Sequence, residues 1–301
     1  MISRISTFAH GNAMVAASLQ VQAKLADQQS QTASGVKSQT YGGMAQSTAS
    51  VLTLNSQSAR LSADSTAATT AGAYVQAAYS AVGQIADLAT TVKTQLASMM
   101  SGSTAGADTI SQYASDWLAD LKTLLNSQQG GTYLFSGQAT DVAPADFSAA
   151  GYDPTADETA SDTGYYQGAA TGRTYASSEG QTIGLSVSAN APAFEQLARA
   201  IAIVAAHPDD SDAIKSAYAL AGTALSGVGT LQESVSIQAA SLSSITDRNT
   251  AQIDAIGDLV TSMKGADLSQ AAVMVTQYQT QLEAMYSMIS KLASMSLTKY
   301  L

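Results

Sequence analysis

The chain lacks cysteine and is poor in charged and aromatic residues. Only 12% of its 301 residues are charged and 6% are aromatic, whereas about 25% of the residues of an average soluble protein are charged. The absence of cysteine excludes disulfides, thiolate metal sites and cysteine nucleophiles. Alanine, serine, threonine and glutamine replace the usual charges, and a surface of this kind can be buried against another copy without leaving ions unpaired. The composition therefore favours a packed assembly.

The basic residues form no cluster. The net charge is −10, and the 13 lysines and arginines are scattered along the chain. Recognition of a phosphate backbone needs clustered lysine and arginine side chains. We therefore expect no nucleic acid partner.

Long apolar runs are also missing. The first twenty residues carry one formal charge, Arg4, and lack the apolar core of roughly 7 to 15 residues that marks a secretory signal. No stretch reaches the roughly 20 apolar residues of a membrane span, because serine, glutamine or aspartate interrupts each candidate. We expect no cleaved signal peptide and no membrane insertion.

Proline is absent from both ends of the chain. All four prolines lie in the middle, at Pro144, Pro154, Pro192 and Pro208, and helix interiors exclude proline. Glycine is also frequent between residues 130 and 184. The sequence therefore predicts long helices in both flanks and a turn-rich centre.

The strongest periodic pattern lies near the C-terminus. Apolar residues recur there at alternating spacings of three and four, which places them on one face of a helix: Leu268, Ala271, Val275, Tyr278, Leu282, Met285, Ile289 and Leu292. Apolar residues between 253 and 263 keep the same spacing, which ends at Gly265. Asp267 is available to cap the next helix. This predicts a helix pair or one kinked long helix.

Four further helices are predicted from helical spacing. They cover residues 45–100, 107–126, 193–206 and 212–244. At 1.5 Å per residue, the first would extend roughly 80 Å. Trp117 and Tyr113 stand at helical spacing in the second, which predicts that they pack in the core.

The centre shows a different period. Tyr133 and Phe135 alternate with polar neighbours, and so do Ile183, Leu185 and Val187, which is typical of half-buried strands. We therefore expect a small β domain there. Residues 141–163 are acidic and contain glycine, and we expect part of this segment to be a mobile loop.

A search for catalytic and metal-binding residues finds none. The two histidines, His10 and His207, lie on different predicted elements, and the acidic residues 209–212 fit the N-terminal cap of a helix. The carboxylates between residues 153 and 162 do not have the spacing of a calcium-binding loop. We predict no catalytic, cofactor-binding or metal-binding residue, no cofactor and no enzymatic activity.

Three separated segments resemble one family, the bacterial flagellins and, more closely, the flagellar hook-associated protein that joins hook to filament. They are Arg4-Ile5-Ser6-Thr7 with the turn Ala33-Ser34-Gly35-Val36-Lys37, the segment from Gly130 to Gly137 that reads Gly-Gly-Thr-Tyr-Leu-Phe-Ser-Gly, and the ending Met295-Ser296-Leu297-Thr298-Lys299-Tyr300-Leu301. The residues that carry the resemblance are Arg4, Ile5, Ser6, Thr7, Gly131, Tyr133, Phe135, Gly137, Tyr300 and Leu301. Tyr41-Gly42-Gly43-Met44 departs from the proline and paired aspartates of many relatives.

The resemblance implies a mainly α fold, with long N- and C-terminal helices in a coiled-coil bundle and a small central β-rich domain. The expected parts are an N-terminal assembly helix and turn (1–44), the two halves of a helical rod (45–129 and 193–264), a β-rich outer domain (130–192) and a C-terminal assembly helix (265–301). The assembly seam would comprise Ile5, Phe8, Val15, Leu19, Leu268, Val275, Tyr278, Leu282, Met285, Ile289, Leu292 and Leu297.

The resemblance also implies partners and a location. They are copies of the chain itself, neighbouring hook-associated protein and flagellin subunits, and an export chaperone at the C-terminal region. The place is the extracellular hook-filament junction of the bacterial flagellum, reached by type III export.

Three alternatives remain open. A heptad pattern cannot distinguish a contact between copies from a helical bundle within one chain. Within the family, the chain could be a short flagellin that forms the filament itself. From another class, it could be a secreted helical adhesin that binds a surface through its β domain.

Overall fold

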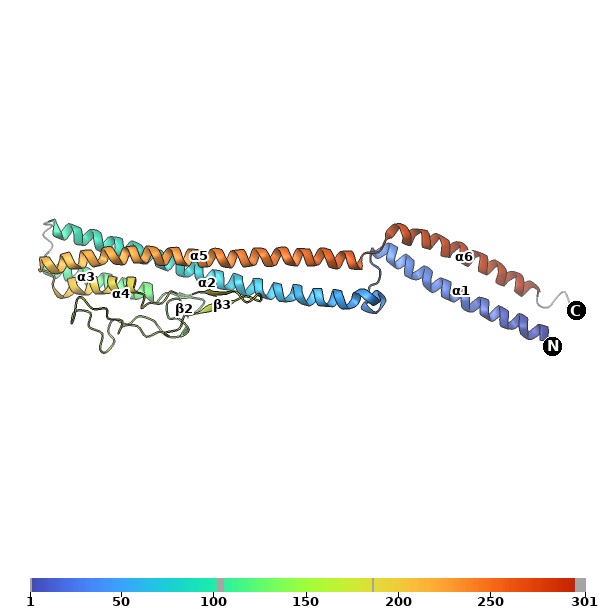
Figure 1. Ribbon diagram of the computed structural model, residues 1–301, viewed down its shortest axis with the longest axis horizontal. Coiled ribbons are helices and arrows are strands. Elements are labelled where there is room, and N and C mark those ends of the chain that lie inside the picture. The colour runs from blue at the N-terminus through green and yellow to red at the C-terminus, as the bar shows by residue number, and fades with distance from the viewer. Residues whose placement is uncertain (1, 102–105, 186, 296–301) are drawn as a thin grey trace. The chain divides into compact units, whose positions relative to one another are not determined.

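The protein is mainly α-helical, as predicted. The computed structural model describes residues 2–101, 106–185 and 187–295. Its helices are α1 (Ile2–Ser34), α2 (Thr48–Met100), α3 (Ala107–Leu125), α4 (Pro192–Ala206), α5 (Ser211–Lys264) and α6 (Leu268–Met295), with a 3-10 helix η1 (Tyr41–Ser47) between α1 and α2 (Figure 1). The short strands β1 (Gln128–Gln129), β2 (Thr132–Tyr133), β3 (Thr174–Ala176) and β4 (Thr182–Gly184) form two antiparallel pairs.

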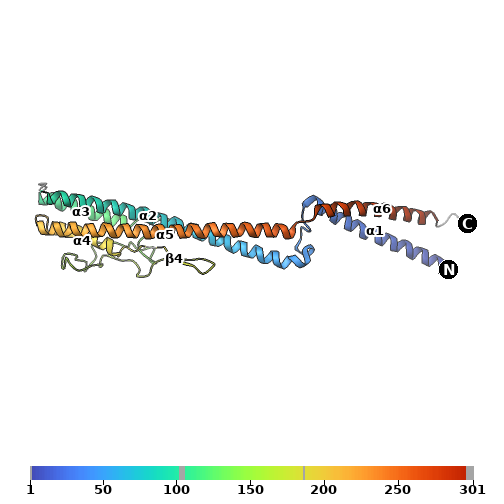
Figure 2. The same cartoon turned by 45° about the horizontal axis from the view of Figure 1, so that its top comes forward.

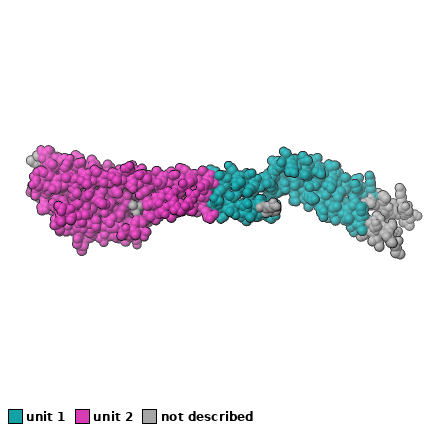
Figure 3. Space-filling view, in the orientation of Figure 1, with its two compact units in different colours: residues 1–59, 253–301 teal, residues 60–252 magenta. Residues whose placement is uncertain are grey.

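The chain divides into two compact units, coloured separately in Figure 3. Unit 1 comprises Met1–Ala59 and Ile253–Leu301, and unit 2 comprises Arg60–Gln252. Unit 1 therefore contains α1, η1, α6 and one end each of α2 and α5. The five-part division expected from the sequence stays a prediction.

In unit 2, α2 and α5 each bury one continuous stripe. The residues of the α2 stripe alternate at spacings of three and four: Leu61, Asp64, Ala68, Ala71, Val75, Ala78, Val82, Ile85, Ala89, Val92 and Leu96. Tyr74, Ala81 and Leu88 are buried beside this stripe. The stripe of α5 has the same spacing: Ile214, Ala217, Ala221, Ala224, Val228, Val235, Leu242, Ile245 and Asn249, with half-buried Leu231 and Gln238 in the two gaps.

The two helices run antiparallel in unit 2. Near one end, the Asn249 amide donates a 2.9 Å hydrogen bond to the Asp64 carboxylate. Farther along α2, the Lys93 ammonium lies 5.6 Å from the centre of the Tyr218 ring. A later residue of α2 therefore lies beside an earlier residue of α5, as in an antiparallel pair.

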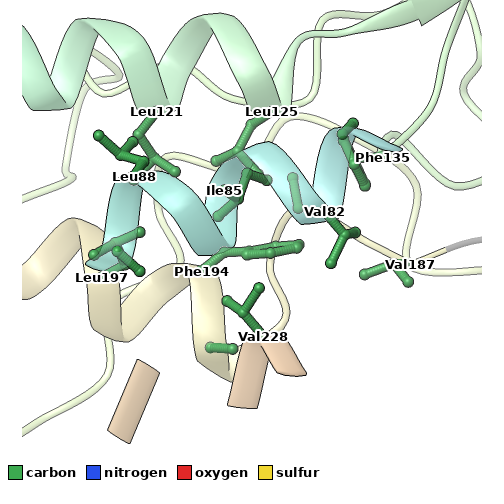
Figure 4. Close-up of a cluster of buried hydrophobic side chains, with 14 of the residues drawn as sticks. Val82, Ile85, Leu88, Leu121, Leu125, Phe135, Val187, Phe194, Leu197 and Val228 are labelled. Carbon is green, nitrogen blue, oxygen red and sulfur yellow. The ribbon is translucent and has the colours of Figure 1, made fainter. Parts of the chain in front are cut away.

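Helices α3 and α4 complete the core of unit 2. Leu121 and Leu125 of α3 and Phe194 and Leu197 of α4 meet the α2 stripe, as Figure 4 shows around Ile85. Trp117 is buried as predicted, whereas Tyr113 stacks on it with 6.0 Å between ring centres and stays 42% exposed.

The β region is smaller than the sequence predicted. Tyr133 and Ile183 lie in strands, but the predicted strand positions Phe135, Leu185 and Val187 lie outside them. The neighbours Leu134 and Phe135 are both fully buried, which breaks the alternation of a half-buried strand. Phe135 instead packs edge-on against Phe194, at 5.8 Å between ring centres.

Helix α5 is longer than predicted. The sequence divided this region near residue 244, but the helix continues without a break from Ser211 to Lys264. Its start confirms the predicted acidic cap, because the Asp210 carboxylate accepts hydrogen bonds from the backbone N–H groups of Asp212 (2.8 Å) and Ala213 (3.3 Å).

The acidic segment of the centre folds as a series of turns held on α4. The carboxylates of Asp153 and Asp157 each accept a backbone N–H from the threonine two residues ahead. The buried Arg199 side chain donates to the carbonyl oxygens of Glu158 (3.1 Å) and Ala160 (2.7 Å). Glu195 lies 3.2 Å from the Arg199 guanidinium and balances its charge.

One buried carboxylate attaches the β3–β4 hairpin to both long helices. Asp64 accepts hydrogen bonds from the Tyr175 hydroxyl (2.8 Å), the Ser178 N–H (3.1 Å) and hydroxyl (3.2 Å), and the Asn249 amide. Burial acts to raise the pKa of Asp64, but these hydrogen bonds outweigh it and hold the pKa below its usual value. Burial and the neighbouring Asp64 raise the pKa of Tyr175 to about 12.

We predict that Asp64→Asn destabilises the protein by about 2 kcal/mol at neutral pH, because hydrogen bonds to a charged group contribute roughly 1.5–3 kcal/mol. The folded pKa lies below the unfolded value of about 3.9, so the contribution is complete above about pH 5 and disappears as the pH falls through the folded pKa. Thermal unfolding at several pH values should show a difference from the wild type that shrinks below about pH 4.

Asp87→Asn is the matched control, since this carboxylate lies on the same helix and is exposed. It should unfold within about 0.5 kcal/mol of the wild type. A pH-independent loss in Asp64→Asn would contradict the assignment of the carboxylate charge as the stabilising group.

Candidate assembly surface

Helices α1 and α6, from the two ends of the chain, form an antiparallel pair in unit 1 (Figures 1 and 2). The end of α1 meets the start of α6, where the Ala266 N–H donates to the Gly35 carbonyl at 2.9 Å. Farther along, the Gln22 amide donates to the Tyr286 hydroxyl. The predicted pairing of the two chain ends is therefore present within a single molecule.

The α6 side of this pair uses most of the predicted seam. Ala271 and Leu282 are buried, at 2% and 7% exposed. Val275, Tyr278, Met285 and Ile289 are half-buried and complete the same spacing. Leu268, also predicted in the seam, is 49% exposed. The side chains of Leu292, Ile5 and Phe8, and all of Leu297, lie outside the described part of the chain.

The α1 side uses a different face from the one expected. The least exposed positions follow spacings of three and four: Gly11, Met14, Ser18, Val21, Leu25 and Gln28. The predicted seam residues Val15 and Leu19 each come one position later and are 46% and 59% exposed. One residue is a rotation of about 100° around the helix. Two exposed apolar side chains, Val15 and Leu19, therefore lie beside the buried face.

The turn after α1 is joined to the break between α5 and α6. Gly35 has a φ of +72°, which suits glycine, and Val36 bridges to Gly265. Lys37 donates its backbone N–H to the Lys264 carbonyl (2.7 Å) and its ammonium to the Met263 carbonyl (3.1 Å). A cation at this end of α5 complements the helix dipole.

The start of α6 confirms the predicted cap. The Asp267 carboxylate accepts the Gln270 N–H at 3.0 Å, as in a standard helix N-cap. Gly265 ends one helix and Asp267 begins the next, so the break between them is encoded locally.

Exposed apolar side chains gather in unit 1. Of the thirteen large apolar side chains exposed in the described part of the chain, nine belong to this smaller unit: Val15, Leu19, Tyr41, Leu52, Leu259, Leu268, Val273, Tyr286 and Met288. Such a concentration on the surface is typical of a site for protein contacts.

The charge is divided just as unevenly. Unit 1 holds six basic and five acidic residues, a net charge of +1. Unit 2 holds seven basic and eighteen acidic residues, a net charge of −11. The unit with the exposed apolar side chains is therefore almost neutral.

The central segment that carries the family resemblance has a structural role in unit 2. Gly130 and Gly131, with φ of +58° and +80°, form the two-residue turn of the β1–β2 hairpin. Gly137 has a φ of +65°, and a Cβ there would lie 2.6 Å from the Thr171 carbonyl oxygen. Arg4, Ile5, Ser6 and Thr7 belong to α1, but their side chains, and all of Tyr300 and Leu301, lie outside what the structure describes.

Other kinds of site have little support in the described residues. No group of three or more histidine, cysteine, aspartate or glutamate side chains is placed there to hold a metal. None of the helices in that part of the chain has the length and apolar character needed to cross a membrane. His207 lies 3.6 Å from the Glu158 carboxylate, and His10 lies on α1.

Comparisons with known proteins give solved structures only. No family model and no curated protein matches the chain. FlgL of Bacillus cereus is 12% identical, with a TM-score of 0.48 over 69% of this chain and 96% of its own. A flagellar hook-associated protein from Vibrio parahaemolyticus is 16% identical, with a TM-score of 0.45 over 71% of this chain and 97% of its own. These scores and identities are too low to assign a function to the chain.

We predict that Leu282→Asp opens the α1–α6 pair, because it places a charge among apolar side chains at a position only 7% exposed. Limited proteolysis of the purified monomer should cut α1 and α6 at least several times faster than in the wild type, while fragments of unit 2 persist. Circular dichroism should show the matching loss of helix.

Val273→Asp is the matched control, since it makes the same kind of change on the same helix at a position 64% exposed. Its monomer should resist protease as the wild type does. Equal sensitivity of the two variants would refute the orientation of α6.

Proposed function

We propose that this chain is a structural subunit of the bacterial flagellum that forms the junction between hook and filament. The observation that carries the proposal is the pair of helices from the two chain ends in a nearly neutral unit that holds nine of the thirteen exposed large apolar side chains of the described residues. A subunit that functions by assembly needs exposed apolar side chains to bury against its neighbours, whereas a free monomer gains nothing from them.

The flagellar part of the proposal rests on the three resembling segments. The first forms the start of α1 and the turn at Gly35, and the second forms the β1–β2 turn and the buried Leu134-Phe135 step. The third begins at Met295, the last residue of α6. The two solved structures are flagellar by name, which agrees with the proposal but does not carry it.

The mechanism of such a subunit is burial of apolar surface between copies. Complete burial of a Leu or Val side chain contributes roughly 1.5–3 kcal/mol. The proposed partners are copies of the chain, neighbouring hook-associated protein and flagellin subunits, and an export chaperone at the C-terminal region. The proposed place is the extracellular flagellum, reached through its export apparatus.

We predict that cells without this chain make hooks but no attached filaments, with filament protein released into the medium. Electron microscopy of the cells and assay of the medium for filament protein are the measurements. Restoring the wild-type gene should restore filaments.

The same experiment separates the alternatives. Hooks that lack filaments, with no filament protein in the medium, would identify this chain as the filament subunit itself. Filaments of normal length on swimming cells would exclude both flagellar roles and favour the adhesin.

A further inference from the structure

We propose that a cavity between the two hairpins of unit 2 binds a saccharide that carries a carboxylate, such as a uronic acid, and that Arg173 recognises the carboxylate. This binding activity goes beyond the proposed function and does not depend on the role at the junction.

The cavity lies on α2, between the turn of the β1–β2 hairpin and strand β3. Its volume is about 610 Å³, which is within the range of roughly 300–1,000 Å³ that is typical of small-molecule sites. Its lining comes from α2, from the turn of the first hairpin, from β3 and from Leu185, the residue after β4. All of these elements contribute from within unit 2.

Small residues keep this cavity open. The wall formed by α2 presents Ala67, Ala71 and Ala73. In the hairpin turn, a Cβ added to Gly130 would meet no other atom within 4 Å. The space between the hairpins is therefore wide enough at both walls for a ligand to enter.

The Arg173 side chain is held in place inside the cavity. Its guanidinium carbon lies 4.3 Å from the centre of the Tyr74 ring, and stacking of this kind fixes the plane of a guanidinium. The ring is itself fixed, because the Tyr74 hydroxyl donates to the Leu134 carbonyl at 2.7 Å. A guanidinium with a fixed plane can bind a carboxylate through two parallel N–H donors.

The charge of the lining selects an anion. Arg173 is the one charged residue among the described residues that line the cavity, although unit 2 holds eighteen acidic residues. A calcium ion would need several oxygen ligands that include carboxylates. A phosphate monoester carries roughly two negative charges at neutral pH, so one guanidinium matches the single charge of a carboxylate better.

The uncharged polar residues of the lining fit the hydroxyl groups of a sugar. Thr70, Thr132 and Thr174 each have a hydroxyl and Gln129 has an amide, and all four side chains can both donate and accept hydrogen bonds. The Thr132 hydroxyl donates to the Gln129 carbonyl at 2.9 Å and keeps its capacity to accept. Sugar hydroxyls also donate and accept, whereas a simple aliphatic acid would leave these groups without a partner.

The test is isothermal titration calorimetry of the purified full chain with digalacturonic acid, a disaccharide with a carboxylate on each ring. Its methyl ester is the matched ligand, because it has the same rings without the charges. The acid should bind to a single site, and the ester should bind more weakly by roughly tenfold or more, since hydrogen bonds to charged groups are the stronger ones.

Variants of the chain locate the site. Arg173→Gln should weaken binding of the acid by roughly tenfold or more. Arg248→Gln is the matched control and should bind as the wild type does, because it removes the same charge from unit 2 at an exposed position where the arginine pairs with Glu179. Ala67→Phe keeps Arg173 but fills the cavity from an exposed position of α2, and it should abolish binding. Thermal unfolding of each variant checks that it is folded.

Each contrary result overturns a stated part of the proposal. Equal binding of the acid and the ester would overturn recognition of the carboxylate. Wild-type affinity in Ala67→Phe and in folded Arg173→Gln would overturn the site. If digalacturonic acid does not bind, the saccharide assignment is wrong, and binding of acetyl-Thr-Asp-Thr-amide that Ala67→Phe removes would assign the cavity to an acidic peptide instead. The deletion experiment tests the junction role separately, so its outcome and these outcomes are distinguishable.

Discussion

The fold depends on two helices that must meet in one register. The stripes of α2 and α5 in unit 2 repeat the same spacing of three and four over many turns and consist largely of alanine and valine. Such uniform stripes could slide past each other by a heptad with little loss of apolar contact. The Asp64–Asn249 pair prevents this, because a shifted register would leave a carboxylate and an amide buried without partners. One polar contact thereby selects a single alignment from several that are similar in apolar burial.

The same carboxylate explains why the centre of the chain has a definite structure with so little sheet. The hairpin strands are two or three residues long, too short to be stable alone. Asp64 holds one hairpin through Tyr175 and Ser178, and the Tyr74 hydroxyl holds the other segment by donating to the Leu134 carbonyl at 2.7 Å. The helices therefore supply the hydrogen bonds that a larger sheet would have provided for itself.

The sequence predicted the features that depend on local spacing. Gly265 and Asp267 mark the break before α6, and the periodic residues from Ala271 to Ile289 lie on its covered face. The sequence did not predict the features that depend on which other element packs against a residue. On α1 the sequence did not single out the face that α6 covers, with Met14, Ser18 and Val21, because Val15 and Leu19 of the assigned assembly seam lie one position away and are also apolar. Phe135 was misassigned to a strand for the same reason, since the core formed with α4 determines its place.

The inner face of α1 has a consequence for the stability of unit 1. Three of its six covered positions, Met14, Val21 and Leu25, bury a large apolar side chain, whereas Gly11, Ser18 and Gln28 bury little apolar surface, so the apolar contact of the α1–α6 pair is interrupted. A helix pair with a weak inner contact opens easily when alone. Any partner that binds only the paired form stabilises it by mass action. The stability of unit 1 would then depend on the concentration of that partner, because the paired form alone has an interrupted apolar contact.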